Sequence, residues 1–134
     1  TATLTTQGIF MGVKYTDPTT KQMTFSQYWP ASTVATDAFA YVLTDPDVVF
    51  MMQADGAIAQ TAIGSNFDVI QTAGSTSIGN SKNAVDADST ATTATFPLRI
   101  YDFYDGPSST IGDAFTDALF IFNVGHQYRN TTGV

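Results

Sequence analysis

The aspartates are the residues of this chain best able to carry out chemistry by themselves. The sequence contains twelve aspartates and no glutamate, and several are close in sequence. Two carboxyl groups about 5 to 10 Å apart can hydrolyse glycosidic bonds, but spacing along the chain does not fix that distance. We therefore interpret the close pairs as turn and cap residues, with an Asp-pair hydrolase as the alternative: Asp45 with Asp47, Asp86 with Asp88, Asp102 with Asp105, and Asp113 with Asp117.

His126 is the only histidine and follows the last apolar run. As a general base it would need a nucleophile within reach and a group that orients its ring. The sequence has no Gly-x-Ser-x-Gly nucleophile motif and no Asp-Ser/Thr-Gly motif of aspartic proteases. We predict that the protein is not an enzyme, has no catalytic residues, and uses His126 in a structural or interface role.

Calcium is a second use for aspartates, because it prefers hard oxygen ligands supplied by loops. Asp86 and Asp88 alternate with small residues, as at the start of a calcium loop. The pattern lacks the glycine and the closing glutamate of an EF-hand. Asp86 and Asp88 are therefore the only metal candidates, and no cofactor is predicted.

An aromatic cluster offers binding rather than catalysis. Tyr28 and Trp29, with Tyr15, could form a platform on which a sugar ring stacks. A single tryptophan in a strand can equally belong to a core or an interface. As interface candidates we name the aromatic residues Tyr28, Trp29, Tyr101, Phe103 and Tyr104.

The remaining composition predicts the fold that positions these groups. Leucine, glutamate and lysine, which favour helices, are scarce or absent, whereas threonine and aspartate favour strands and turns. A chain of 134 residues is long enough for one domain with its own core. We predict a single all-β domain over residues 1–134, an antiparallel β-sandwich or a small β-barrel.

Apolar runs separated by turn residues locate the strands. In residues 23–29 the alternation places Met23, Phe25, Gln27 and Trp29 on one side, and in residues 95–104 it separates Ile100 from Phe103. Residues 57–63 could form a short helical turn, and the small polar residues 72–93 a long surface loop or arm. The expected strands cover residues 8–15, 23–29, 38–43, 48–53, 67–71, 95–104 and 118–124.

Charge and cysteine content exclude several classes of protein. The formal net charge is −7 with five basic residues, which is the wrong sign for contacting phosphate backbones or anionic lipid. No run approaches the ~18 apolar residues of a membrane span. There is no cysteine, so disulfides and thiolate chemistry are excluded. We expect a soluble protein with no direct nucleic-acid or membrane partner.

Several longer strings resemble small virion proteins of tailed bacteriophages, particularly phages of aquatic bacteria. The resemblance runs nearly end to end, and none of its motifs is catalytic. The strings are GIFMGVKYTDP (8–18), SQYWP (26–30), TDPDVVF (44–50), FPLRIYDFYDGP (96–107) and VGHQYRN (124–130).

The resemblance implies a capsid decoration or cement protein on the outside of the phage head. Its partners would be the major capsid protein and further copies of itself, with a trimer favoured, and it implies neither a cofactor nor catalytic residues. A tail- or fibre-associated carbohydrate-binding β domain is the alternative, and exposure of Trp29 and Tyr28 in a groove is the feature that would favour it.

Overall fold

The computed structural model describes residues 5–124 and 126. Nearly all regular structure in them is β, in antiparallel sheets, with two short 3₁₀ helices. The predicted all-β, sandwich-like class is confirmed, and the described residues form no closed barrel. Most of the motif at 124–130 lies outside the described residues. Within the described part of the chain, no helix is long and apolar enough to cross a membrane.

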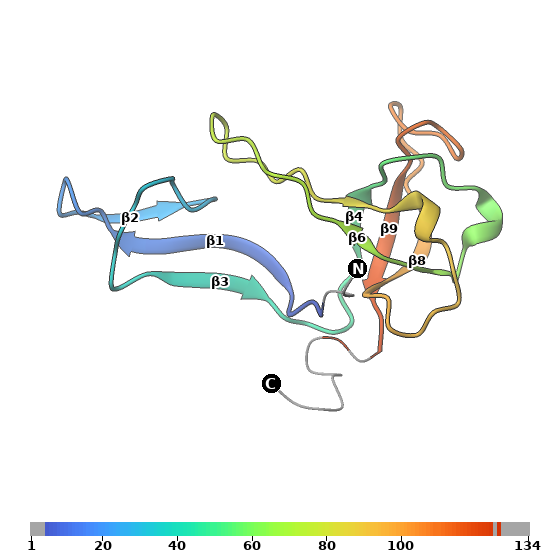
Figure 1. Ribbon diagram of the computed structural model, residues 1–134, viewed down its shortest axis with the longest axis horizontal. Coiled ribbons are helices and arrows are strands. Elements are labelled where there is room, and N and C mark those ends of the chain that lie inside the picture. Colours follow the sequence, from blue (N-terminus) through green and yellow to red (C-terminus); the bar gives the residue numbers. More distant parts are fainter. Residues whose placement is uncertain (1–4, 125, 127–134) are drawn as a thin grey trace.

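Residues 9–43 form a thin three-stranded sheet that projects from the rest of the molecule, and we call it the wing (Figure 1). Its strand order is β2-β1-β3, and both pairings are antiparallel. The β1–β2 turn is fixed by Asp17, whose carboxylate accepts hydrogen bonds from the amides of Thr19 and Thr20 at 2.7 and 3.1 Å. The strands are β1 (Ile9–Thr16), β2 (Met23–Ser26) and β3 (Phe39–Leu43).

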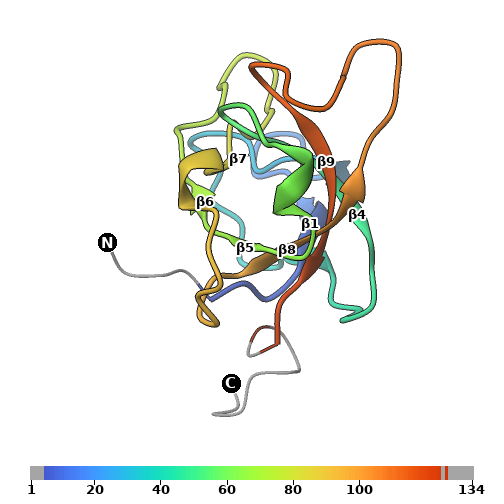
Figure 2. The same cartoon turned by 90° about the vertical axis from the view of Figure 1, so that its right-hand side faces the viewer.

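Residues 44–70 and 84–124 form a compact body with two sheets. The larger has the order β4-β9-β8-β5, and β6 pairs with β7. Figure 2 shows β6 and β7 on the side of the body opposite β4 and β9. The strands are β4 (Phe50–Gln53), β5 (Asn66–Phe67), β6 (Val69–Ile70), β7 (Ala84–Val85), β8 (Leu98–Phe103) and β9 (Asp117–Phe122), and the 3₁₀ helices are η1 (Gln60–Ala62) and η2 (Ala87–Ser89).

The core lies between the two sheets of the body. Phe67 and Phe120 meet edge to face, with ring centroids 5.9 Å apart, and both are completely buried. Ile9 at the root of the wing packs against this core. Residues that are nearly inaccessible to solvent complete it, among them Ala54, Ile58, Val85, Leu98, Ile100 and Ala118.

Residues 71–83, between β6 and β7, form an arm that extends from the body alongside the wing (Figure 1). The arm closes on itself near its tip: the amide of Ser75 donates to the carbonyl of Asn80, and the amide of Gly79 donates to the carbonyl of Ser75, both at 2.9 Å. The range 72–93, predicted as one long loop or arm, is therefore an arm only in its first part, because β7 and η2 follow the arm as parts of the body.

Two predicted strand faces differ from the structure. A bulge in β8 between Ile100 and Asp102 turns Phe103 inward, where its main-chain amide donates to the Asp102 carboxylate at 2.8 Å. β2 ends at Ser26, whose hydroxyl accepts from the amide of Tyr28 at 3.2 Å. This turn ends the alternation, so Trp29 is not on the face of Phe25.

Candidate functional site

The register of the wing assigns each side chain to one of its two faces, because residues directly opposite in an antiparallel pair share a face. Lys14 is opposite both Phe25 and Phe39. Apart from Ile9, which packs against the body, the apolar side chains that the register places on this side are exposed, Phe25 to 67%. We call this side the open face and define it by Met23, Phe25, Phe39, Tyr41 and Leu43.

The opposite side of the wing, the covered face, carries a small core. Val13 and Tyr15 are buried there, and the Trp29 ring packs on Tyr15 with centroids 5.2 Å apart. Phe10 belongs to this side because it is opposite Val42. The segment that follows β2 therefore folds over one face of the sheet and leaves the other bare.

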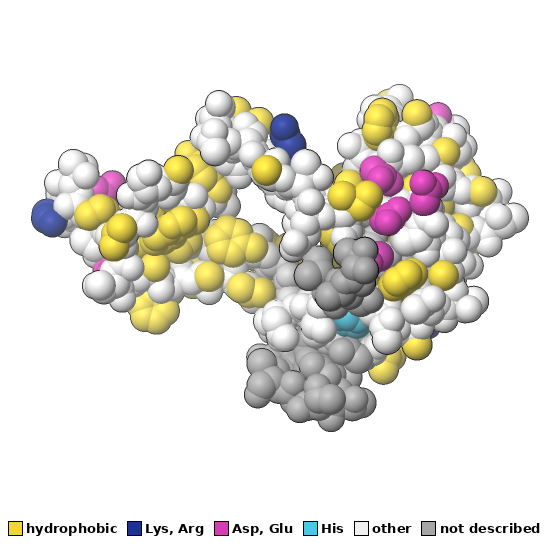
Figure 3. All heavy atoms as spheres, in the orientation of Figure 1, with side chains coloured by type: hydrophobic (Ala, Val, Ile, Leu, Met, Phe, Trp, Pro, Cys, Tyr) yellow, Lys and Arg dark blue, Asp and Glu magenta, His cyan; other side chains and the backbone are white. Residues whose placement is uncertain are grey.

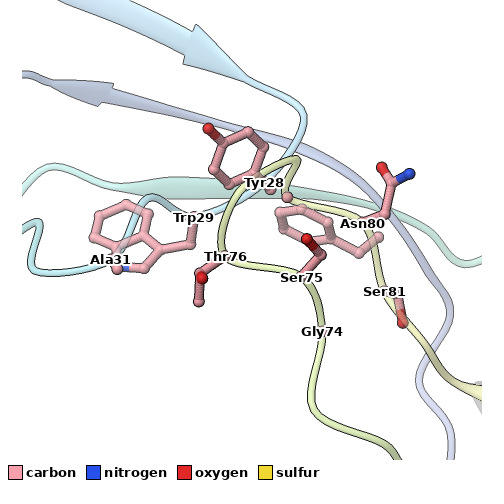
Figure 4. Close-up of a pocket in the computed structure, with 10 residues that line it drawn as sticks. Tyr28, Trp29, Ala31, Gly74, Ser75, Thr76, Asn80 and Ser81 are labelled. Atoms are coloured by element: carbon pink, nitrogen blue, oxygen red, sulfur yellow. The ribbon is translucent and has the colours of Figure 1, made fainter.

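A pocket opens between the covered face and the arm, with a volume of about 410 Å³. Its aromatic wall comes from Phe10, Tyr28 and Trp29, and Trp29 remains 42% exposed. The opposite wall comes from the arm, where Ser75 and Thr76 lie across from Trp29 (Figure 4). No residue that lines this pocket is charged.

Gly79 lies directly against the Tyr28 ring, where the arm meets the wing. It has a φ of +71°, and a Cβ at this position would lie 2.2 Å from Cδ1 of Tyr28. A side chain is therefore excluded by the Tyr28 ring as well as by the backbone conformation. This contact positions the arm residues across from Trp29.

Charge separates the wing from the body. Residues 5–43 carry two lysines and two aspartates, whereas residues 44–124 carry ten aspartates against Lys82 and Arg99. Apolar side chains are prominent along the wing and acidic ones gather on the body in Figure 3. In the wing, hydrogen bonds from the Thr16 hydroxyl and amide lower the pKa of Asp37.

The structure distributes the predicted interface residues over three places. Tyr28 and Trp29 line the same pocket, and Tyr101 and Tyr104 are exposed on the body. Phe103 is not a surface residue: it is 8% exposed and belongs to the core of the body. The β8 bulge explains this difference, since it reverses the side on which Phe103 emerges.

The aspartates mostly satisfy main-chain amides. Asp86 caps η2 by accepting from the amide of Asp88 at 3.1 Å, and Asp45 accepts from the amide of Asp47 at 2.9 Å. Asp113 accepts from the amide of Thr110 at 2.7 Å. Among the residues that the structure describes, no three His, Cys, Asp or Glu side chains gather as metal ligands.

His126 joins the segment that precedes the wing to the end of the body. Its Nδ1 accepts a hydrogen bond from the amide of Thr6 at 3.2 Å, and the residue is 4% exposed. Burial lowers the pKa of His126, an effect partly opposed by a hydrogen bond to the backbone of Thr95. These contacts describe a neutral, structural imidazole.

The arm side of the pocket was not predicted from the sequence. Residues 72–93 are small and polar and predict a surface loop or arm without indicating what it contacts. The one available signal was Gly79, because a glycine can mark a place where the backbone comes close to another residue, but it does not identify that residue.

Comparison with protein-family models, curated proteins and solved structures finds no match for the chain.

Proposed function

We propose that the protein is a non-enzymatic structural component of a virion, a capsid decoration or cement protein that binds and stabilises the major capsid shell. The observation that carries the proposal is the open face of the wing. A monomeric protein rarely exposes a large contiguous apolar patch unless another molecule covers it. The resemblance to small phage virion proteins supplies the partner and the location on the head surface.

The contrast in charge supports assembly through the wing. The wing carries only two lysines and two aspartates, so burying it against a partner removes few charged groups from water, among them Lys14, which the register places on the open face. The acidic body would remain outside and keep the particle surface soluble. In the same proposal, further copies of the chain associate into a closed ring, with a trimer favoured.

Matched serine substitutions test the role of the open face on purified phage heads stripped of this protein. Phe25 and Phe115 have similar exposure, 67% and 61%, but only Phe25 is on the wing. Burying a phenylalanine side chain contributes about 1.5–3 kcal/mol. We expect Phe25→Ser to weaken binding to heads at least about tenfold, and Phe115→Ser to bind as the unchanged protein does.

Mass measurement and cosedimentation distinguish the outcomes. A trimer retained on heads is the expected result for the unchanged protein. A monomer that never binds heads would defeat the proposal. Retention on isolated tails but not on heads would move the protein to the tail or its fibres, which is the alternative position.

A further inference from the structure

The pocket between the arm and the covered face of the wing has the chemical character of a small-molecule site. Its volume of about 410 Å³ falls in the usual range of about 300–1,000 Å³ for such sites. One wall is aromatic, and the facing wall is formed by small polar residues of the arm. The two walls come from segments about 50 residues apart in sequence, 10–31 and 74–81.

The aromatic wall is partly open to solvent. The Trp29 ring rests on Tyr15 in a tilted arrangement and remains 42% exposed. Figure 4 shows Thr76 beside Trp29 and Ser75 farther along the arm. A ligand with one apolar face could lie on the indole while its polar edge reaches the hydroxyls of Ser75 and Thr76.

The polar wall is preorganised. Two main-chain hydrogen bonds of 2.9 Å, Ser75 N–H to Asn80 O and Gly79 N–H to Ser75 O, close the tip of the arm. The Tyr28 ring holds the tip at Gly79. A ligand would therefore meet hydroxyl groups already in place, which lowers the entropy cost of binding.

The absence of charge among the residues that line the pocket selects the class of ligand. An anion would find no lysine or arginine there, and a quaternary ammonium ion would find aromatic rings but no carboxylate. An uncharged ring with one apolar face and hydroxyls on its rim matches both walls. We propose that this pocket binds a neutral saccharide, with one pyranose ring stacked on Trp29.

This site is separate from the surface proposed to bind the capsid. Phe10, Tyr28 and Trp29 belong to the covered side of the wing, while Phe25 and Tyr41 define the open face. The saccharide proposal does not depend on the cement role. Sugar binding by a chain that fails to bind heads would leave it intact.

The single tryptophan is a built-in reporter, because Trp29 is the only source of indole fluorescence. The unchanged protein is titrated with neutral hexasaccharides of glucose, mannose and N-acetylglucosamine, and with choline and inorganic phosphate as charged probes. We expect at least one hexasaccharide to give a saturable change in Trp29 emission, and neither charged probe to do so. The proposal would be overturned if only choline or phosphate gave saturation. It would also be overturned if no sugar gave saturation up to about 10 mM, which corresponds to a weak binding free energy of about −2.7 kcal/mol.

Three variants locate the binding. Ala31→Phe adds a bulky side chain to the pocket lining and should weaken binding at least about tenfold, while Thr76→Val removes one hydroxyl and should weaken it about threefold to tenfold. Ser77→Ala, on the same arm but outside the pocket lining, is the control and should bind as the unchanged protein does. Equal binding by Ala31→Phe would place the sugar elsewhere and overturn the assignment.

Discussion

The wing and the body use similar apolar residues with opposite results. In the body, Phe67 and Phe120 are completely buried between two sheets, whereas in the wing Phe25 and Phe39 point into solvent from a single sheet. The body has its own core and carries most of the negative charge, while the wing has little core and no net charge. The difference indicates that the body is stabilised by its own packing, whereas the open face has no other part of the described chain packed over it.

The largest expected effect is on the free energy of unfolding, and it is tested by making the same phenylalanine-to-alanine substitution once in the body and once in the wing. Phe120→Ala empties a fully buried site and should lower the free energy of unfolding by about 3–5 kcal/mol. Phe25→Ala, the control, should change it by about 0.5 kcal/mol or less, because its side chain is already exposed. Chemical denaturation of the isolated protein measures both. Equal losses would show that the wing is packed as tightly as the body.

Lowering the pH should weaken the contact between His126 and the segment that precedes the wing. The pKa of His126 is lowered in the folded protein, so its contribution to stability is present above the usual value of 6.5 and is lost as the pH falls through the folded pKa. Protonation also removes the acceptor at Nδ1 for the Thr6 amide. Thermal unfolding at a series of pH values should show this loss. His126→Gln should flatten the dependence over that window, and an unchanged profile would contradict the assignment.

His126→Ala tests the same junction at neutral pH. It leaves the amide of Thr6 without its acceptor and should cost about 1–3 kcal/mol. Hydrogen exchange of the Thr6 amide should rise, while exchange in β8 and β9 stays slow. Faster exchange throughout the body would mean that His126 supports the core and not the junction.

A pair of glycines isolates the contact between arm and wing. Gly79 and Gly64 both have positive φ, +71° and +85°, but only at Gly79 does a Cβ meet another residue, the Tyr28 ring. Gly64→Ala should cost about 1 kcal/mol from backbone strain alone. Gly79→Ala should cost at least as much and should also release the arm, seen as altered Trp29 emission. If the two variants share the same emission spectrum, the arm does not rest on Tyr28.

The smallest effect belongs to a surface carboxylate of the wing. The pKa of Asp37 is lowered mainly by the hydroxyl of Thr16, so its stabilising effect is present above the usual value of 3.8 and is lost as the pH falls through the folded pKa. Asp37 is exposed, so solvent screens this contribution. Titration by NMR should find the Asp37 pKa below that of the same residue in Thr16→Val. Identical values would rule out the hydrogen bond from the Thr16 hydroxyl.

Most of the longer strands were predictable from sequence because alternation and turn residues are local signals, whereas β7 lies in the range expected to be a loop or arm and the strand expected over residues 67–71 is divided between two sheets. The side on which Phe103 emerges was not, because it depends on a bulge that the simple alternation of residues 95–104 does not reveal. Trp29 was assigned to the wrong face because the Ser26 turn interrupts an apparent alternation. The pocket was only half predictable: Tyr28 and Trp29 stand out by type, but the arm reaches them through a contact between distant segments.

The bulge in β1 affects the direction in which the wing projects from the body. Met11 is the extra residue, since Phe10 pairs with Val42 and Gly12 with Tyr41, the next residue on β3. A bulge bends its strand and increases the local twist, and β1 curves toward the body in Figure 1. Deleting Met11 would keep every pairing of β1 with β3 and straighten the strand. The direction in which the open face points is therefore set by one residue of chain length, independently of the side chains that the face presents.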